Sequence, residues 1–128
     1  MAVVELDQGG FEAAIQDNAF VIVDFWAPWC GPCRSFAPVY EKVSADFDDI
    51  LFAKVNTEDE QQIAAHFNIR SIPTLMIFRE QTIIYAQAGA MPEARFRELL
   101  SKARDLDMAE VKRQEAEKRN DAQNSDSA

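Results

Sequence analysis

Apolar positions along the chain repeat with two periods, which separate predicted strands from predicted helices. The run from Phe20 to Trp26 is apolar at every position except Asp24. Such a run predicts a strand that is buried on both faces at the centre of a sheet. The remaining predicted strands cover residues 3–6, 50–55, 74–78 and 82–88. Only a few residues separate the last two strands, and so short a link forces them to pair antiparallel.

Apolar residues at helical spacing predict four helices between these strands. The predicted helices cover residues 11–15, 33–47, 63–67 and 92–103. Pro38 lies inside the second helix and should kink it, whereas Pro92 suits a first helical turn. Thr57 and Glu60 have the spacing of a capping box before the third helix. The order β-α-β-α-β-α-β-β-α predicts an α/β fold, with a central mixed sheet flanked by helices on both faces.

The composition changes after about Leu106, which divides the chain into a domain at 1–106 and a tail at 107–128. Met108 and Val111 are the only large apolar residues of the tail, so we expect it to add almost no apolar area to the fold. Mixed charges at helical spacing predict a helix for its first half. The end from Asn120 is small and polar and predicts disorder.

Charge and composition narrow the classes of function. The chain has 128 residues, is 48% hydrophobic and carries a formal net charge of −9. The negative charge argues against binding to nucleic acid or to an anionic membrane surface. The N-terminus carries neither a basic segment nor a long apolar run, so we expect no secretory signal and no transmembrane span. A cytoplasmic protein is the expectation that fits best.

The two cysteines, Cys30 and Cys33, are the strongest chemical signal. A Cys-x-x-Cys pair behind an apolar run predicts a redox dithiol, because this spacing lets the two sulfurs close a small disulfide ring. If Cys33 enters a helix, the positive helix end points at the first sulfur and favours its thiolate. Half of a zinc site is the alternative. Zinc needs about four ligands, and the chain offers only His66 besides the two cysteines.

Asp24 is the second chemical signal, because a carboxyl group in an apolar central strand is costly unless it is paired or neutralised. Burial should raise its pKa and allow it to carry a proton near neutral pH. Lys54, on a neighbouring predicted strand, is its expected ionic partner. The alternative is a purely structural Asp24–Lys54 pair without a catalytic role.

Several short segments, taken in order, resemble the thioredoxin family over roughly residues 2–106. They are the stretch from Val23 to Cys33, the Ala37-Pro38 pair, Lys54, the Ile72-Pro73-Thr74 segment and the Ala88-Gly89-Ala90 segment. The turn near 79–82 lacks the usual Asn-Gly pair, and the charged tail is additional. The resemblance implies the thioredoxin fold.

The resemblance also implies roles for individual residues. Cys30 would be an exposed attacking thiolate, Cys33 the buried resolving thiol, and Asp24 the acceptor of the Cys33 proton through a water molecule. Gly31 and Pro32 would shape the turn into the helix and accompany a reducing character.

The resemblance further implies a binding rim for the substrate. Pro73 alone would be a strand-start proline, usually trans, but the resemblance makes it a cis-proline beside the dithiol. The Ile72 backbone could then pair with an extended substrate segment. An apolar rim is implied, made of Trp29, Ile72, Gly89 and Ala90.

We therefore interpret the chain as a protein disulfide reductase that exchanges electrons between its dithiol and substrate disulfides. The expected partners are disulfide-containing client proteins and, as electron donor, a thioredoxin reductase, in most of the family a flavoprotein that uses NADPH. No cofactor or metal is expected on this chain, because the cysteines carry the electrons, and we expect it to act as a monomer. The alternatives are a binding module or co-chaperone with incidental redox activity, and an oxidase or isomerase.

Overall fold

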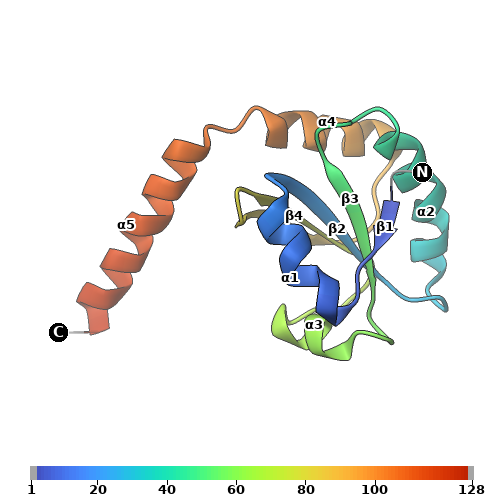
Figure 1. Cartoon of the computed structure of the whole chain (residues 1–128), viewed down its shortest axis with the longest axis horizontal. Helices are drawn as coiled ribbons and strands as arrows, with labels where there is room; N and C mark the ends of the chain where they lie inside the picture. Colours follow the sequence, from blue (N-terminus) through green and yellow to red (C-terminus); the bar gives the residue numbers. More distant parts are fainter. Residues whose placement is uncertain (1–2, 127–128) are drawn as a thin grey trace.

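The computed structural model describes residues 3–126 and has the predicted order of elements (Figure 1). The strands are β1 (Val3–Glu5), β2 (Phe20–Trp26), β3 (Leu51–Asn56), β4 (Thr74–Arg79) and β5 (Thr82–Ala88). The helices are α1 (Gln8–Asp17), α2 (Gly31–Ser44), α3 (Gln61–His66), α4 (Glu93–Arg104) and α5 (Met108–Asp126). None of the described helices is long and apolar enough to cross a membrane.

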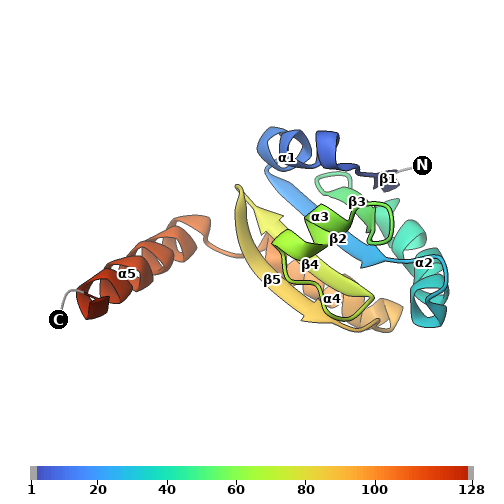
Figure 2. The ribbon, with the colours of Figure 1, turned by 90° about the horizontal axis from the view of Figure 1, so that it is seen from below.

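The five strands form one sheet in the order β1-β3-β2-β4-β5 (Figure 2). β3 pairs parallel with both β1 and β2, whereas β4 pairs antiparallel with β2 and with β5. The sheet is therefore mixed, as predicted, and β2 lies at its centre. Its central position explains why five of its seven residues are apolar and buried.

Alternate residues of β2 serve two separate cores, one on each face of the sheet. Phe20 and Ile22 pack with side chains of α2 and α4, whereas Val21, Val23 and Phe25 pack with side chains of α1 and α3. Two helices therefore cover each face. Asp24 follows Ile22 by two positions, so the carboxyl group faces the layer of α2 and α4.

The turn between β4 and β5 consists of Glu80 and Gln81, which connect the paired residues Arg79 and Thr82. Both turn residues have positive φ, at 50° and 69°. Asn and Gly are the usual residues of such two-residue turns because they tolerate this backbone conformation best. The turn lies where the sequence predicts it but is made from residues that adopt it at a cost.

The predicted capping box at the start of the third helix is wrong. Glu60 is the N-cap residue of α3 and makes no side-chain capping bond. Thr57 instead donates from its hydroxyl and its backbone N–H to the Trp26 carbonyl, at 3.1 and 2.8 Å. Thr57 thus fixes the end of β2 rather than the start of α3.

The tail begins with a helix of its own, because α4 ends at Arg104 and α5 starts at Met108. α5 extends away from the sheet in both views (Figures 1 and 2). Met108 is only 5% exposed, and Lys112 forms an ion pair with Glu80 in the β4–β5 turn at 2.8 Å. The expectation that the tail adds almost no apolar area is therefore wrong at its first helical residue. The helix is described as far as Asp126, which lies beyond Asn120, where the sequence predicts that disorder begins. The division of the chain into two parts at residue 106 stays a prediction.

Candidate active site

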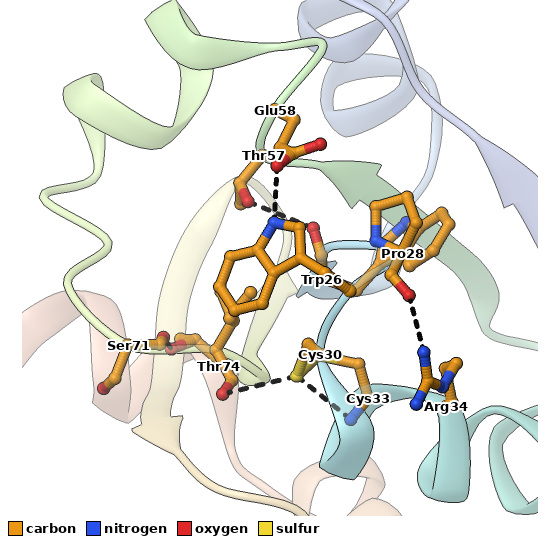
Figure 3. The surroundings of a disulfide bond; sticks show 11 residues. Trp26, Pro28, Cys30, Cys33, Arg34, Thr57, Glu58, Ser71 and Thr74 are labelled. Carbon is orange, nitrogen blue, oxygen red and sulfur yellow. Dashed lines mark hydrogen bonds between the residues drawn. A yellow bond between two sulfur atoms is a disulfide. The ribbon is translucent and has the colours of Figure 1, made fainter.

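A disulfide between Cys30 and Cys33 lies at the start of α2 (Figure 3). Cys30 is the N-cap residue, and Gly31 and Pro32 occupy the first helical positions. Proline suits this position because its missing N–H has no partner within the helix anyway. The helix thus brings the two Cα atoms to 5.2 Å, within the range that a disulfide spans.

The end of the helix directs a hydrogen bond at the first sulfur. The backbone N–H of Cys33 donates to Cys30 Sγ at 3.2 Å. When the disulfide is reduced, the same N–H and the positive end of the helix favour negative charge on this sulfur. Cys30 is therefore the sulfur that the fold stabilises as a thiolate.

Both cysteines are buried in this disulfide-bonded form, Cys30 at 4% exposure and Cys33 at 2%. The expected contrast between an exposed and a buried sulfur is therefore small here. Cys30 Sγ lies 3.8 Å from the Ile72 carbonyl oxygen, so the loop before β4 covers it on one side.

The peptide bond between Ile72 and Pro73 is cis, as the resemblance implies. The loop around it is held by two short hydrogen bonds: the Gly89 N–H donates to the Pro73 carbonyl at 2.7 Å, and the Thr74 hydroxyl donates to the Ser71 carbonyl at 2.6 Å. Ile72 stays half-buried beside the disulfide. The structure therefore brings the predicted Ile72-Pro73 segment next to Cys30.

The other predicted rim residues are at the surface. Trp29 is 64% exposed, and Gly89 and Ala90 are exposed as well. Gly89 has φ +108°, a conformation that side-chain-bearing residues rarely adopt, and open space lies where a Cβ would be. A substrate backbone can therefore come close to this residue.

Asp24 lies under the α2 layer and is 1% exposed. Burial raises its pKa from 3.8 to about 7, with the positive charge of Lys54 lowering it and the negative charge of Glu5 raising it. One carboxyl oxygen, Oδ1, has no hydrogen-bond partner. A carboxyl group in this state can take up and release a proton near neutral pH.

Lys54 is paired with Asp24 in the β2–β3 register. Its ammonium lies 4.3 Å from the centre of the Trp26 ring, and it acts on Asp24 through space rather than through a contact ion pair. The two residues predicted as partners are thus neighbours in the sheet.

The Thioredoxin family model matches residues 2–102. The chain belongs to the thioredoxin family. It is 51% identical over 114 residues to the protein named "Putative thioredoxin 2" from Streptomyces coelicolor, an alignment that covers 89% of this chain and 85% of that protein. It is 41% identical over 104 residues to "Thioredoxin" from Pyropia yezoensis, covering 80% of this chain and 97% of the relative.

Solved thioredoxin structures have the same fold. A mutant thioredoxin from Halobacterium salinarum superposes with a TM-score of 0.76 at 27% identity, covering 82% of this chain and 93% of that one. A thioredoxin from Plasmodium falciparum gives 0.72 at 32% identity, covering 77% and 96%. Membership of the family, together with the Cys30–Cys33 disulfide, identifies a thiol-disulfide oxidoreductase that acts on protein disulfides. The alternative of a binding module with incidental redox activity is not favoured.

Two residues that the sequence does not single out, Glu58 and Arg34, contact the loop that leads to the disulfide. The Trp29 indole N–H donates to Glu58 Oε1 at 2.5 Å, and the backbone N–H of Glu58 in turn donates to Asn56 Oδ1 at 3.0 Å. Arg34 donates to the Pro28 carbonyl at 3.2 Å. Both contacts fix the loop before α2. Nothing in the local sequence around Glu58 or Arg34 signals them.

In the described part of the chain, no group of three His, Cys, Asp or Glu side chains is placed to hold a metal ion. His66 is exposed on α3, with its ring against Phe67 at 4.8 Å. It lies in the layer of α1 and α3, whereas the cysteines belong to α2. The zinc alternative therefore lacks its third ligand here.

Proposed function

We propose that this thioredoxin reduces disulfides of client proteins, with Cys30 as the nucleophile and Cys33 as the resolving thiol. The Cys33 N–H bond to Cys30 Sγ carries this assignment, because it stabilises a thiolate on Cys30. Cys30 attacks one sulfur of the substrate, forms a mixed disulfide and releases the other substrate sulfur as a thiolate. Cys33 then attacks Cys30, which releases the second substrate thiolate and restores the Cys30–Cys33 disulfide. Two electrons pass from the dithiol to the substrate.

The second step requires Cys33 to lose a proton, and we assign Asp24 as the base. Its pKa of about 7 supports this role, because the carboxylate and the acid are then both populated near neutral pH. Lys54 moderates the pKa by its positive charge. A purely structural role for the pair would leave the rate of this step unchanged in an Asp24→Asn variant.

The rim around the disulfide would bind an extended segment of the substrate. Trp29, Gly89 and Ala90 are exposed around the cis-proline loop, and the Ile72 backbone would pair with the segment as an added strand. We further propose that the protein acts as a monomer in the cytoplasm and receives electrons from a thioredoxin reductase. A reducing compartment suits a chain whose two cysteines form a single exchangeable pair.

The assignment of the two sulfurs is tested by trapping. Cys33→Ser should accumulate mixed disulfides with client proteins that dithiothreitol releases, because the resolving thiol is absent. Cys30→Ser should trap none and should lose insulin reduction, and the double variant serves as the matched control. Equal trapping by the two single variants, or normal turnover by Cys30→Ser, would contradict the roles.

The direction of transfer is tested by equilibrating the Cys30–Cys33 pair with glutathione buffers. A reductase has a low reduction potential, so its pair should remain a disulfide in mildly reducing glutathione buffers and should become a dithiol only in strongly reducing ones. A pair that is already fully reduced in a mildly reducing buffer would have an oxidising potential and would support the oxidase or isomerase alternative.

A further inference from the structure

Three charged residues form one row across the parallel part of the sheet. In the register of β1 with β3, Glu5 is opposite Lys54, and in the register of β2 with β3, Lys54 is opposite Asp24. Paired residues of parallel strands point to the same face of the sheet. The Lys54 side chain thus starts from a backbone position between two carboxyl-bearing residues.

The row lies on the face that α2 and α4 cover. Two positions earlier on the same strands are Val3, Phe52 and Ile22, and all three belong to the core or pack against it on that face. The period of two along a strand places the charged row on the same face. A lysine flanked by two acids therefore continues an otherwise apolar layer.

The environment of Glu5 differs from that of a free surface carboxylate. β1 is the edge strand, and the Glu5 residue as a whole is exposed. Partial burial nevertheless raises the pKa of the Glu5 carboxyl, while Lys54 and the Trp26 indole lower it and Asp59 raises it. The indole N–H of Trp26 has no well-formed hydrogen-bond partner of its own. Glu5 therefore acts on the same lysine as Asp24 does, from the other side of the row.

We propose that Glu5 is a positioning residue, which holds the Lys54 ammonium between the two carboxyl groups and thereby controls how readily Asp24 takes up a proton. This inference rests on the proposed function of Asp24 as the base for Cys33. One ammonium serves two acids, and Lys54 makes a contact ion pair with neither. Without Glu5, Lys54 is free to turn toward Asp24 and to stabilise its carboxylate.

Other charged or titratable groups face this row and stay constant in the test. Tyr40 of α2 lies above it, donates its hydroxyl to the carbonyls of Ile22 and Ala53, and has a pKa that burial and then Asp24 raise. On the outer side, Asp59 acts on Glu5, and Asp7 and Glu60 line the same surface pocket as Glu5 and Asp59.

The experiment follows the Asp24 carboxyl carbon by NMR as pH changes, in the disulfide form, so that cysteine titration does not interfere. In Glu5→Gln the midpoint of the Asp24 titration should fall by about half a pH unit, because a like charge is removed and Lys54 is released. Glu41→Gln removes the same charge at an exposed position of α2 that does not act on Asp24, and it should leave the midpoint in place. Glu5→Asp keeps the charge and should restore most of the original midpoint.

A double variant separates positioning from the direct effect of the Glu5 charge. In a Lys54→Met background, Glu5→Gln should shift the Asp24 midpoint clearly less than it does in the unaltered protein. An equal shift in both backgrounds would mean that Glu5 acts by its charge alone, and no shift in either would remove it from the network. Both results would overturn the proposal. The titration tests whether Glu5 controls the protonation of Asp24. Turnover of the Asp24→Asn variant tests whether Asp24 is the base, so either proposal can be refuted without the other.

Discussion

Replacing Asp24 by asparagine should stabilise the protein at neutral and alkaline pH. Folding raises the pKa of this carboxyl from 3.8 to about 7, so the folded state binds more protons than the unfolded state between these two values. Stability therefore falls as pH rises through this window and levels off above about pH 7. At about 1.4 kcal/mol per pH unit, the ionised carboxylate costs up to about 4 kcal/mol.

The asparagine variant lacks this penalty. Oδ1 of Asp24 already has no hydrogen-bond partner. An amide in its place also leaves some polar atoms unpaired, which reduces the increase in stability. We expect the variant to be about as stable as the unaltered protein near pH 4 and more stable by about 2 to 4 kcal/mol at pH 8. It should also reduce insulin more slowly, because Cys33 loses its base.

The assay is urea unfolding of both proteins in the disulfide form at several pH values between about 4 and 9. The exposed Asp48→Asn variant is the control for the loss of one negative charge, and its stability should follow that of the unaltered protein across the range. A variant at position 24 that is no more stable at pH 8, or less stable, would refute the reasoning. It would show that the ionised carboxylate gains more from Lys54 than burial costs.

Four further variants test the stability of the domain and of its tail. Met108→Ala should lower the free energy of unfolding by about 2 kcal/mol, because the side chain is buried. Deletion of residues 120–128 should leave the free energy of unfolding unchanged. Equal unfolding midpoints for the two variants would contradict this prediction. Replacing Glu80 and Gln81 by Asn-Gly should raise the thermal midpoint, because both replaced residues have positive φ, and should stabilise the fold by about 1 kcal/mol. A lower midpoint would show that the lost Glu80–Lys112 ion pair matters more. Tyr40→Phe should cost about 1 to 3 kcal/mol in urea unfolding, since its hydroxyl bonds two strand carbonyls, and a cost near zero would mean that these carbonyls find other partners.

The elements and the chemistry that depend on residues close together in the chain could be predicted from the sequence. The apolar run of β2 predicted its bounds, Phe20 to Trp26, because burial on both faces excludes polar residues. The Cys-x-x-Cys spacing predicted the disulfide, since three residues at the start of a helix set the distance between the sulfurs.

Features that depend on residues far apart in the chain could not be predicted in this way. The row that joins Glu5 to Lys54 and Asp24 exists only through the pairing of β1 with β3 and of β3 with β2. Met108 is likewise buried although it lies beyond the end of α4 at Arg104, in the segment that the composition assigns to the tail. Periodicity records whether a side chain faces inward, but it does not record which distant side chain lies beside it, because register and docking are set by the packing of the whole domain.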